Sequence, residues 1–460
     1  VIYVGVIAEL LNIDQEILEK AISKQFGSKV KAIELNSEAA RLGREYARDN
    51  LTKIDPYLVE ARESEADQFF MEGNEALALG SIFGGIQVLA WYPITPSSSV
   101  AEGIIHWLPE LREKDGKATY AVIQAEDELA AAGMIIGAGW AGARAMTATS
   151  GPGISLMQEF IGLSYFAEIP CVFWDVNRVG PSTGLPTRTQ QGDLTMLYES
   201  SHGDTLHIVL IPGTVEECFE FGWKAFDVSE RYQTPVMGFS DLDLGMNKWA
   251  CKGFDYPDTP MDRGKVLLTQ EQLDAIDNYG RYRDVDGDGI PYRTLPGSGL
   301  DPILYRGTGH DEDGNYSEKP DVYFKLMARL KRKIMNSADD LPEPIFREEK
   351  ECEVGIVYYG SMENIIQEID DILEETGRKV SQCRVRALPL HSGVKEFMER
   401  HETVIVLEVN RDAQLNGIMR KEMPTELLTR IHSVAYSDGL PPRATLYADM
   451  ILKVLEEVGA

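Results

Sequence analysis

The chain has 460 residues and a net charge of −29 at neutral pH. This length predicts two or three domains of ordinary size. The negative charge argues against a nucleic-acid backbone or an anionic membrane surface as a partner. The sequence contains no run of about 18 apolar residues that could cross a bilayer, and it does not begin with a basic segment followed by an apolar one.

The five cysteines lie far apart, and no Cys-x-x-Cys pair occurs among them. This spacing speaks against an iron–sulfur or zinc site formed by this chain alone. An odd number of cysteines without a pairing pattern fits a reducing compartment, so we expect a cytoplasmic protein. Because the sequence begins at Val1 rather than at methionine, we expect its true N-terminal part to be missing.

The first fifty residues are predicted to form the end of a domain. Residues 1–7 are predicted to be a strand, and residues 14–25 and 37–50 are predicted to be helices. Residues 51–70 are charged and contain Pro56, so they are predicted to be a linker.

Residues 71–249 alternate between strand and helix patterns. The predicted strands are 120–124, 145–148, 171–175, 207–211 and 236–239. The predicted helices are 74–90, 127–140, 154–166 and one that begins at Thr214, where Glu217 would complete a capping box. Strands that alternate with helices predict an α/β fold with a parallel sheet covered on both faces. Such sheets bind ligands in the loops beyond the carboxyl ends of their strands.

The remaining chain is predicted to form an irregular connector and a smaller α/β domain. Residues 250–345 are rich in glycine, aspartate, proline and tyrosine and show one basic helix near residues 323–335. Residues 346–460 return to the alternating pattern. Its predicted strands are 354–359, 383–387 and 404–408, and its predicted helices are 363–374, 394–400 and 446–457.

Three acidic residues, Glu126, Asp127 and Glu128, stand where a predicted strand passes into a predicted helix. Acidic residues in a first helical turn favour the helix dipole and cap free N–H groups, which explains Glu126 and Asp127. The helix behind Glu128 is rich in alanine and glycine and lets another backbone or a flat ligand approach closely. A carboxyl group in such a dry cleft can stay protonated and donate a hydrogen bond.

Two further loops carry unusual polar chemistry. The turn at residues 147–154 has free N–H groups that suit a polar ligand or an anion, although many such turns only change the chain direction. The loop at residues 177–191 has two arginines and several hydroxyl groups, which suit a substrate with a carboxylate; alternatively, the arginines only tie the loop down. We expect residues 92–99, 124–128 and 177–191 to converge at one edge of the sheet.

These segments resemble the α subunits of 2-oxoacid:ferredoxin oxidoreductases, most closely those of the 2-oxoglutarate type. The resemblance rests on YPITPSS, QAEDELAAAG with AMTATSGPG behind it, and NRVGPSTGLPTRTQQGDL. It is dense over about residues 70–250 and looser through VIVLEVNRDAQL. It implies a pyrimidine-type thiamine-diphosphate-binding domain over residues 71–249, a transketolase C-terminal-like domain over residues 346–460, and the C-terminal part of a γ domain over residues 1–50.

The resemblance also implies an activity and partners. The family decarboxylates a 2-oxoacid, forms an acyl-CoA from coenzyme A and passes electrons to ferredoxin, or catalyses the reverse reductive carboxylation. A separate β subunit is expected to share the thiamine diphosphate and to carry Mg²⁺ and a [4Fe–4S] cluster, so no metal site is expected in this chain. An αβ pair and an (αβ)₂ assembly both fit. The loop PSTGLPTRT resembles the 2-oxoglutarate type more than the pyruvate type, so we expect 2-oxoglutarate as the substrate.

Residue roles follow from the resemblance by position. Glu128 matches the acid that hydrogen-bonds the pyrimidine ring of the cofactor and takes part in acid–base catalysis through it. The stretch Pro93, Ile94 and Thr95 matches the segment beside the cofactor, and the hydroxyl of Thr95 matches the group that contacts the substrate. Pro93 and Pro96 are expected to fix the backbone so that Thr95 points at the reacting carbon.

The loop after the strand at residues 171–175 supplies the other roles. Arg178 matches the arginine that holds the carboxylate of the substrate or stabilises the charged intermediate. Thr183 and Thr187 fall in the matching substrate loop, and Arg188 is the candidate for the distal carboxylate of 2-oxoglutarate.

Residues 284–290, DVDGDGI, allow two other interpretations. The segment begins like an EF-hand loop, but its twelfth position is Leu295 rather than glutamate, and calcium binding stays open. It also resembles the diphosphate motif of thiamine enzymes, which we reject because no apolar strand precedes it and no helix follows. For the whole chain, two alternatives remain: a non-catalytic scaffold subunit of a redox complex, or a non-oxidative thiamine diphosphate enzyme such as a decarboxylase or transketolase.

Overall fold

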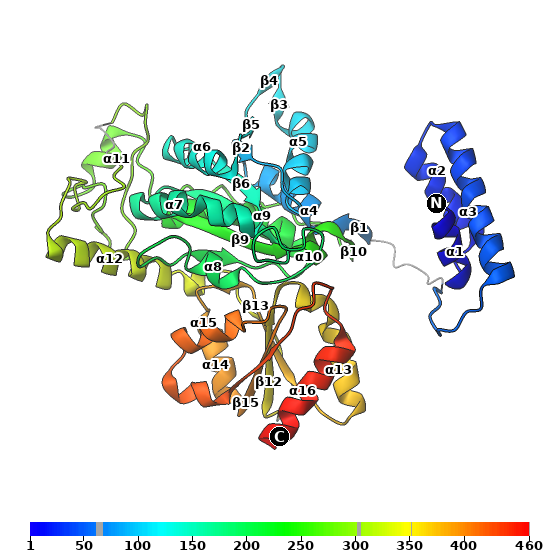
Figure 1. The fold of residues 1–460 in the computed structure, drawn as a ribbon. Coiled ribbons are helices and arrows are strands. Elements are labelled where there is room, and N and C mark those ends of the chain that lie inside the picture. Colours follow the sequence, from blue (N-terminus) through cyan, green and yellow to red (C-terminus); the bar gives the residue numbers. More distant parts are fainter. Residues whose placement is uncertain (61–67, 301–304, 351, 460) are drawn as a thin grey trace. The chain divides into compact units, whose positions relative to one another are not determined.

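The computed structural model describes residues 1–60, 68–300, 305–350 and 352–459 and falls into two units, Val1–Gln68 and Phe69–Ala460 (Figure 1). The first unit consists of helices α1 (Ile2–Leu10), α2 (Gln15–Phe26) and α3 (Val30–Asn50). The predicted strand at residues 1–7 is therefore wrong, whereas the two predicted helices are confirmed. Residues 51–60 of the predicted linker have no regular secondary structure, and residues 61–67 lie outside the described part.

Close packing of α1 on α3 explains why the apolar start of the chain is helical. A Cβ atom at Gly5 would lie 1.9 Å from the carbonyl oxygen of Ala40, and one at Gly43 would lie 1.9 Å from that of Ile2. The two backbones can approach this closely only because both glycines lack a side chain. A short apolar run does not distinguish a strand from a buried helix, and this tertiary contact decides between them.

A seven-stranded sheet organises residues 69–249 (Figure 1). Its order is β14-β8-β9-β7-β6-β2-β5, and every pairing is parallel except that of β14 with β8. The strands are β2 (Val88–Trp91), β5 (Ala121–Gln124), β6 (Ala145–Thr149), β7 (Cys171–Asn177), β8 (Ile208–Leu210), β9 (Pro235–Asp241) and β14 (Ala387–Leu388). The predicted parallel α/β sheet is confirmed.

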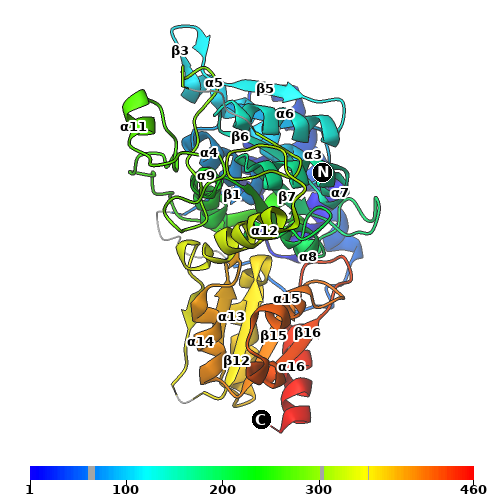
Figure 2. The ribbon, with the colours of Figure 1, turned by 90° about the vertical axis from the view of Figure 1, so that its left-hand side faces the viewer.

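Helices cover both faces of this sheet, as Figures 1 and 2 show. One face carries α6 (Glu128–Trp140), α7 (Gly151–Ala167) and α8 (Leu194–Tyr198), and the other carries α4 (Gly73–Phe83), α5 (Ser98–Arg112) and α9 (Val215–Tyr232). The predicted helix at residues 74–90 is too long, because the chain turns at Gly84 and Gly85, whose φ is +79°, and then enters β2. Helix α5 was not predicted.

The C-terminal residues form a five-stranded sheet of order β11-β13-β12-β15-β16. The strands are β11 (Ile345–Arg347), β12 (Val354–Tyr359), β13 (Ser381–Val385), β15 (Thr403–Glu408) and β16 (Ile431–Ala435). Helices α14 (Ser392–Arg400) and α15 (Gln414–Glu422) pack on one face, and α13 (Glu363–Glu375) and α16 (Ala444–Val458) pack on the other.

The two sheets share one compact unit because the chain passes directly from one to the other. After β13, residues 387–388 add an antiparallel strand, β14, to the edge of the seven-stranded sheet. Beside this crossing, the buried guanidinium of Arg384 donates to both carboxylate oxygens of Glu217 at 2.7 and 2.8 Å. Glu217 therefore serves the contact between the sheets, and only the Thr214 half of the predicted capping box forms.

The segment between the two sheets has little regular structure. It contains α11 (Gln270–Asp274) and α12 (Pro320–Met335). Elsewhere in the unit, two small antiparallel pairings are formed by β1 (Phe69–Glu72) with β10 (Lys248–Cys251) and by β3 (Glu113–Lys114) with β4 (Lys117–Ala118). Helix α12 confirms the predicted basic helix. No helix within the described residues has the length and apolar character needed to span a membrane.

Candidate functional site

Glu128 lies at the start of α6, just beyond the carboxyl end of β5. Asp127, not Glu128, caps this helix, because its carboxylate accepts a hydrogen bond from the backbone N–H of Ala130 at 2.7 Å. Glu128 is therefore free of the capping role, and its side chain is buried. A Cβ atom at Gly153 of α7 would lie 2.9 Å from Glu128 Cγ and 2.0 Å from Thr149 Oγ1, so this glycine leaves room for both side chains.

The serines after the Tyr-Pro-Ile-Thr-Pro stretch anchor the loop that follows β2. The backbone N–H of Ile94 donates to Ser98 Oγ at 3.0 Å, and Ser97 Oγ donates to the carbonyl oxygen of Ile94 at 3.0 Å. From α4, the buried Asn74 donates to the carbonyl oxygen of Pro96 at 2.9 Å. These contacts fix the backbone around Thr95, and the prolines alone would not have indicated them.

Arg178 joins this loop to the end of β7. Its Nη1 donates to the carbonyl oxygen of Thr95 at 2.7 Å, and its side chain is buried. Burial lowers the pKa of Arg178 from its usual value, and the nearby carboxyl groups of Asp175 and Glu128 oppose this shift. The structure therefore brings three predicted residues, Thr95, Glu128 and Arg178, to one edge of the seven-stranded sheet.

The other predicted residues of the loop lie further out. Thr183, Thr187 and Arg188 are exposed, and the loop is held in shape by its own backbone, since the N–H of Val179 donates to the carbonyl oxygen of Arg188 at 3.1 Å. Among the hydrogen bonds of the described residues, none joins these three side chains to Glu128 or Thr95. Their substrate roles stay predictions.

Sequence reasoning missed the residues that anchor the far end of this loop. The backbone N–H of Gln191 donates to the carbonyl oxygen of Val409 at 2.8 Å, and its side chain donates to Asp241 at 3.1 Å and to Ser361 at 3.2 Å. Asn410 donates to the carbonyl oxygen of Gln191 at 3.1 Å. Asp241 ends β9 of the first sheet, whereas Val409, Asn410 and Ser361 come from the C-terminal part of the chain. All four are far from Gln191 in the sequence, so no local motif indicated them.

Several buried polar atoms at this edge have no hydrogen-bond partner among the described residues. They are Thr149 Oγ1, Ser150 Oγ and Arg178 Nε. Buried polar groups in folded proteins are nearly always hydrogen-bonded, and unsatisfied ones mark places where a ligand or water completes the structure. This edge therefore suits a polar ligand.

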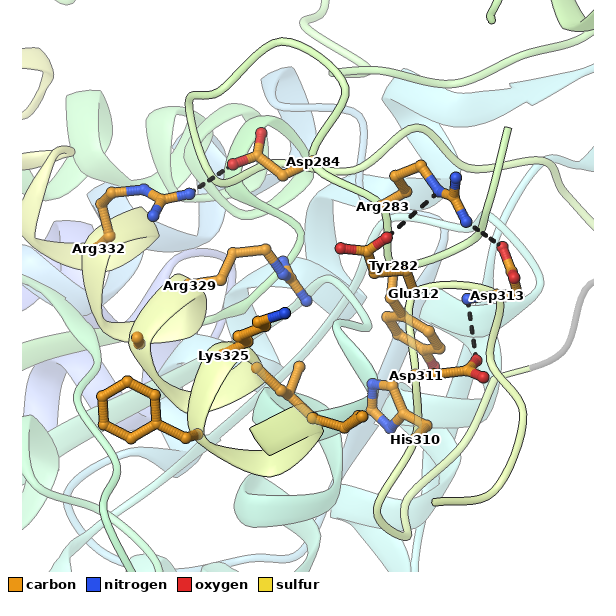
Figure 3. A pocket seen from close by; sticks show the side chains of 14 residues that line it. Tyr282, Arg283, Asp284, His310, Asp311, Glu312, Asp313, Lys325, Arg329 and Arg332 are labelled. Carbon is orange, nitrogen blue, oxygen red and sulfur yellow. Dashed lines mark hydrogen bonds and ion pairs between the residues drawn. The ribbon is translucent and has the colours of Figure 1, made fainter. Parts of the chain in front are cut away.

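The segment that resembled a calcium loop is already occupied by a side-chain cation. Lys265 Nζ lies 2.6 Å from Asp286 Oδ2, 2.9 Å from Asp288 Oδ1 and 3.0 Å from the carbonyl oxygen of Ile290. Asp284 points elsewhere and pairs with Arg332 of α12 at 2.5 Å (Figure 3). A metal ion would have to displace Lys265, and no cluster of three potential metal-ligating side chains occurs among the described residues.

Two cavities of about 600 and 660 Å³ flank α12, and neither is lined by a predicted site residue. Figure 3 shows the first, in which Lys325 and Arg332 lie on α12, whereas Arg283 and the acidic side chains lie on the loops beside it. Most of these charges are already paired inside the chain, for example Arg283 with Asp313 at 2.6 Å. The charged side chains on this surface of the connector thus pair mostly with one another.

Comparisons with known proteins agree with this geometry. A family model described as "Pyruvate flavodoxin/ferredoxin oxidoreductase, thiamine diP-bdg" matches residues 80–249, and one described as "Pyruvate ferredoxin/flavodoxin oxidoreductase" matches residues 1–46. Subunit alpha of 2-oxoacid:ferredoxin oxidoreductase 2 from Aeropyrum pernix is 37% identical over 461 residues, which cover 97% of this chain and 70% of that protein. The chain belongs to the α subunits of the 2-oxoacid:ferredoxin oxidoreductases.

Two other members of this family are similar over much of their length. The 2-oxoglutarate synthase subunit KorA of Methanocaldococcus jannaschii is 36% identical over 322 residues, 69% of this chain and 81% of that protein. A solved structure of 2-oxoglutarate:ferredoxin oxidoreductase from Magnetococcus marinus, with 2-oxoglutarate, coenzyme A and succinyl-CoA bound, has a TM-score of 0.84 and 31% identity. The match covers 98% of this chain and 76% of that one, and the resemblance stated from the sequence is confirmed.

The residues at the sheet edge fit the cofactor that the family model names. Glu128 offers a buried carboxyl group, and Gly153, which has no side chain, lets α7 approach closely without displacing the side chains of Glu128 and Thr149. The unpartnered Thr149 Oγ1 and Ser150 Oγ are polar groups that a heterocycle can satisfy. A thiamine diphosphate pyrimidine ring is therefore compatible with the side chains at this edge.

Proposed function

We propose that this chain is the α subunit of a 2-oxoglutarate:ferredoxin oxidoreductase that decarboxylates 2-oxoglutarate, acylates coenzyme A and reduces ferredoxin, or runs in the reductive direction. The observation that carries the proposal is the meeting of a buried Glu128 with the Arg178–Thr95 contact at one sheet edge. Membership of the family, the 2-oxoglutarate synthase relatives and the oxidoreductase structure support this proposal over a scaffold subunit or a non-oxidative thiamine enzyme.

Glu128 is proposed to hold the aminopyrimidine ring of thiamine diphosphate by a hydrogen bond from its buried carboxyl group. Thiamine diphosphate supplies the electron sink for the electron pair released by decarboxylation. The chain's contribution is to position the carboxyl group of Glu128 and to bury it away from bulk water. Pro93, Ile94 and Thr95 would line the same side, because their loop is fixed by Asn74 and the serines that follow.

Arg178 and Thr95 are proposed to orient the 2-oxoacid. Arg178 already uses one nitrogen to hold the carbonyl oxygen of Thr95, while its buried Nε is unpartnered and can donate to a carboxylate. Arg188, with Thr183 and Thr187 beside it, is proposed to meet the distal carboxylate of 2-oxoglutarate. An exposed arginine suits this role because its planar fork binds carboxylates in a bidentate way.

The proposed partner is a β subunit that carries Mg²⁺ and a [4Fe–4S] cluster and shares the thiamine diphosphate, in an αβ or (αβ)₂ assembly. The five cysteines of this chain are all free, and four of them are buried and lie far from one another in the sequence, which supports a cluster held elsewhere. Free cysteines also support a place in the cytoplasm. No nucleic acid or membrane is proposed as a partner.

The test is the activity of the complex purified with its natural partner. We expect kcat/KM for 2-oxoglutarate to exceed that for pyruvate by about 10-fold or more, because one extra carboxylate–arginine pair is worth about 1.5–3 kcal/mol. Arg188→Met should lower the 2-oxoglutarate value toward that of pyruvate. A preference for pyruvate would overturn the substrate assignment, and unchanged turnover in Glu128→Ala would support a scaffold role instead.

A further inference from the structure

A fully buried carboxyl group and a half-buried one meet at the base of the loop that follows β7. Asp175 is fully buried near the end of this strand. Its carboxyl group lies beside the side chain of Asn177 and beside the carboxyl group of Asp193, which is at the far end of the loop. Two ionised carboxylates in contact inside a protein repel strongly, so such a pair retains a proton between them.

The surroundings favour the protonated pair. Burial, followed by the neighbouring Asp193, raises the pKa of Asp175 well above its usual range, and burial raises that of Asp193. Such a pair titrates as one unit rather than as two independent groups. A single proton between Asp175 and Asp193 forms one hydrogen bond that joins an oxygen of each carboxyl group.

Asn177 extends this contact and ties the two ends of the loop together. Its Nδ2 donates to Asp193 Oδ2 in a short hydrogen bond, and its Oδ1 accepts from the backbone N–H of Gly192 at 3.0 Å. On the other side, a Cβ atom at Gly151 of α7 would lie only 2.2 Å from Asp193 Oδ2, so the start of this helix packs directly on the carboxyl group. The loop base is thus closed by side chains.

The charged groups around the pair are few. Among the described residues, the cation that acts on Asp175 is Arg178, which directly follows Asn177 in the chain. Glu128 of α6 in turn acts on Arg178. In the sheet, Asp175 is flanked by the uncharged Thr149 of β6 and Phe239 of β9. The titratable group on β9 that lies beside the loop is Asp241, which is opposite Asn177 and accepts hydrogen bonds from Gln191 and Ser361.

We propose that Asp175 and Asp193 share one proton and act as positioning residues that close the base of the 177–193 loop, so that Arg178 stays against Thr95. Loss of this proton leaves two facing carboxylates, which repel and release Asp193 together with Asn177. The loop then opens at its base, and the hydrogen bond from Arg178 to the carbonyl oxygen of Thr95 is no longer enforced. This inference rests on the proposed function, because Arg178 and Thr95 are its substrate-facing groups.

The first measurement follows the loop itself by hydrogen exchange in the intact complex. Peptides covering residues 178–192 are compared at pH 6.5 and 8.5 after correction for intrinsic exchange rates. We expect the wild type to lose protection by about tenfold at the higher pH. Asp175→Asn should keep its protection at both values, because an asparagine N–H donates to the Asp193 carboxylate without titrating. In Asp175→Leu, the amides of residues 178–192 should be unprotected at both pH values.

The second measurement follows the effect on the substrate. The KM for the 2-oxoacid should rise about tenfold from pH 6.5 to 8.5 in the wild type with a smaller change in kcat, because binding geometry rather than chemistry is altered. Asp175→Asn should remove this rise, which is a rescue that a purely structural role would not produce. Asp193→Asn should behave like Asp175→Asn, since either amide can replace the shared proton.

The outcomes separate the inference from the proposed function. If Asp175→Asn follows the wild-type pH profile of loop protection, or Asp175→Leu keeps wild-type protection, the shared-proton clamp is wrong whatever the substrate is. If the loop responds as expected but KM does not, the clamp stands and the proposed role of Arg178 and Thr95 fails. Should Asp175→Leu not fold, the two asparagine variants still decide the result.

Discussion

Two regions within residues 69–460 bury ionisable side chains. In one, the buried carboxylate is paired with cations, whereas in the other a buried carboxyl group faces a second carboxyl group. Under α12, the buried carboxylate of Glu168 is paired with Arg329 at 2.5 Å and with Lys333 at 2.7 Å. At the carboxyl edge of the seven-stranded sheet, Asp175 faces a second carboxyl group, and Arg178 keeps a buried nitrogen without a partner. Opposite charges stabilise the fold in the first region, whereas the second keeps capacity for a ligand.

The pKa shifts in the two regions follow this difference. Burial alone would raise the pKa of Glu168, but Arg329 and Lys333 lower it below its usual range. Burial lowers the pKa of Lys333 to about 8, although Glu168 opposes the shift. For Asp175 both burial and Asp193 act in the same direction and raise the pKa. Paired groups stay ionised, and facing groups of like charge keep a proton.

The largest expected effect comes from Glu128, on activity rather than stability. Glu128→Gln should reduce kcat of the assembled complex by about 10²–10⁴-fold, because it removes a positioned acid–base group while keeping the shape of the side chain. Thermal unfolding should change little. Glu126→Gln, an exposed neighbour, is the matched control and should retain turnover. Equal losses in both variants would contradict a specific role of Glu128.

The paired region should show the reverse pattern. Glu168→Leu leaves Arg329 and Lys333 buried without their carboxylate, which typically costs about 3–5 kcal/mol in the free energy of unfolding. Urea unfolding measures this loss, and the turnover of the remaining folded complex should be unchanged. Glu159→Gln, on the exposed side of α7, the helix that ends just before Glu168, is the control. A wild-type unfolding curve for Glu168→Leu would contradict the pairing argument.

Asp175 should link the stability of the protein to pH. In the unfolded chain an aspartate ionises near pH 4, whereas the raised pKa keeps Asp175 protonated in the folded state. Its contribution to stability is therefore complete below about pH 4 and is lost as the pH rises toward the folded-state pKa. Asp175→Asn should be more stable than the wild type at pH 8, and the difference should shrink toward pH 4.5. A difference independent of pH would exclude a protonated Asp175.

The smallest effect is expected at Lys265, whose ion pairs with Asp286 and Asp288 are partly exposed. Lys265→Met should cost about 1 kcal/mol of unfolding free energy, less than a buried pair because water screens these charges. Lys252→Met, an exposed lysine of the same connector, serves as the control. Added Ca²⁺ should leave the melting temperature of the wild type unchanged, and a clear rise would show that a metal ion displaces Lys265.

The fold could be predicted from sequence where local patterns decide it. The two helices that begin after Asp14 and Asp127, and the strands of the parallel sheet, carry periodic patterns and end signals that do not depend on distant residues. The helix at residues 2–10 could not be predicted, because only its contact with Ala40 distinguishes it from a strand. The strand at residues 387–388, which joins the two sheets, likewise depends on a tertiary pairing.

In the candidate site too, local motifs indicated some residues, whereas contacts between distant residues could not be predicted. Glu128 and Arg178 stand in recognisable motifs at strand ends, so the sequence indicated them. The contact of Arg178 with the backbone of Thr95 joins residues 83 positions apart, and that of Gln191 with Ser361 joins residues 170 positions apart. No motif predicts such pairs. The meeting of Asp175 with Asp193 was also missed, because each aspartate alone is ordinary at a strand or helix end.

The most direct test of the central claim is the structure of the assembled complex with thiamine diphosphate bound. We expect the six-membered ring of the cofactor to lie within hydrogen-bonding distance of the Glu128 carboxyl group, with Thr95 and Arg178 on the side of the reacting carbon. A ring bound away from Glu128, with that carboxyl group facing only protein or water, would contradict it.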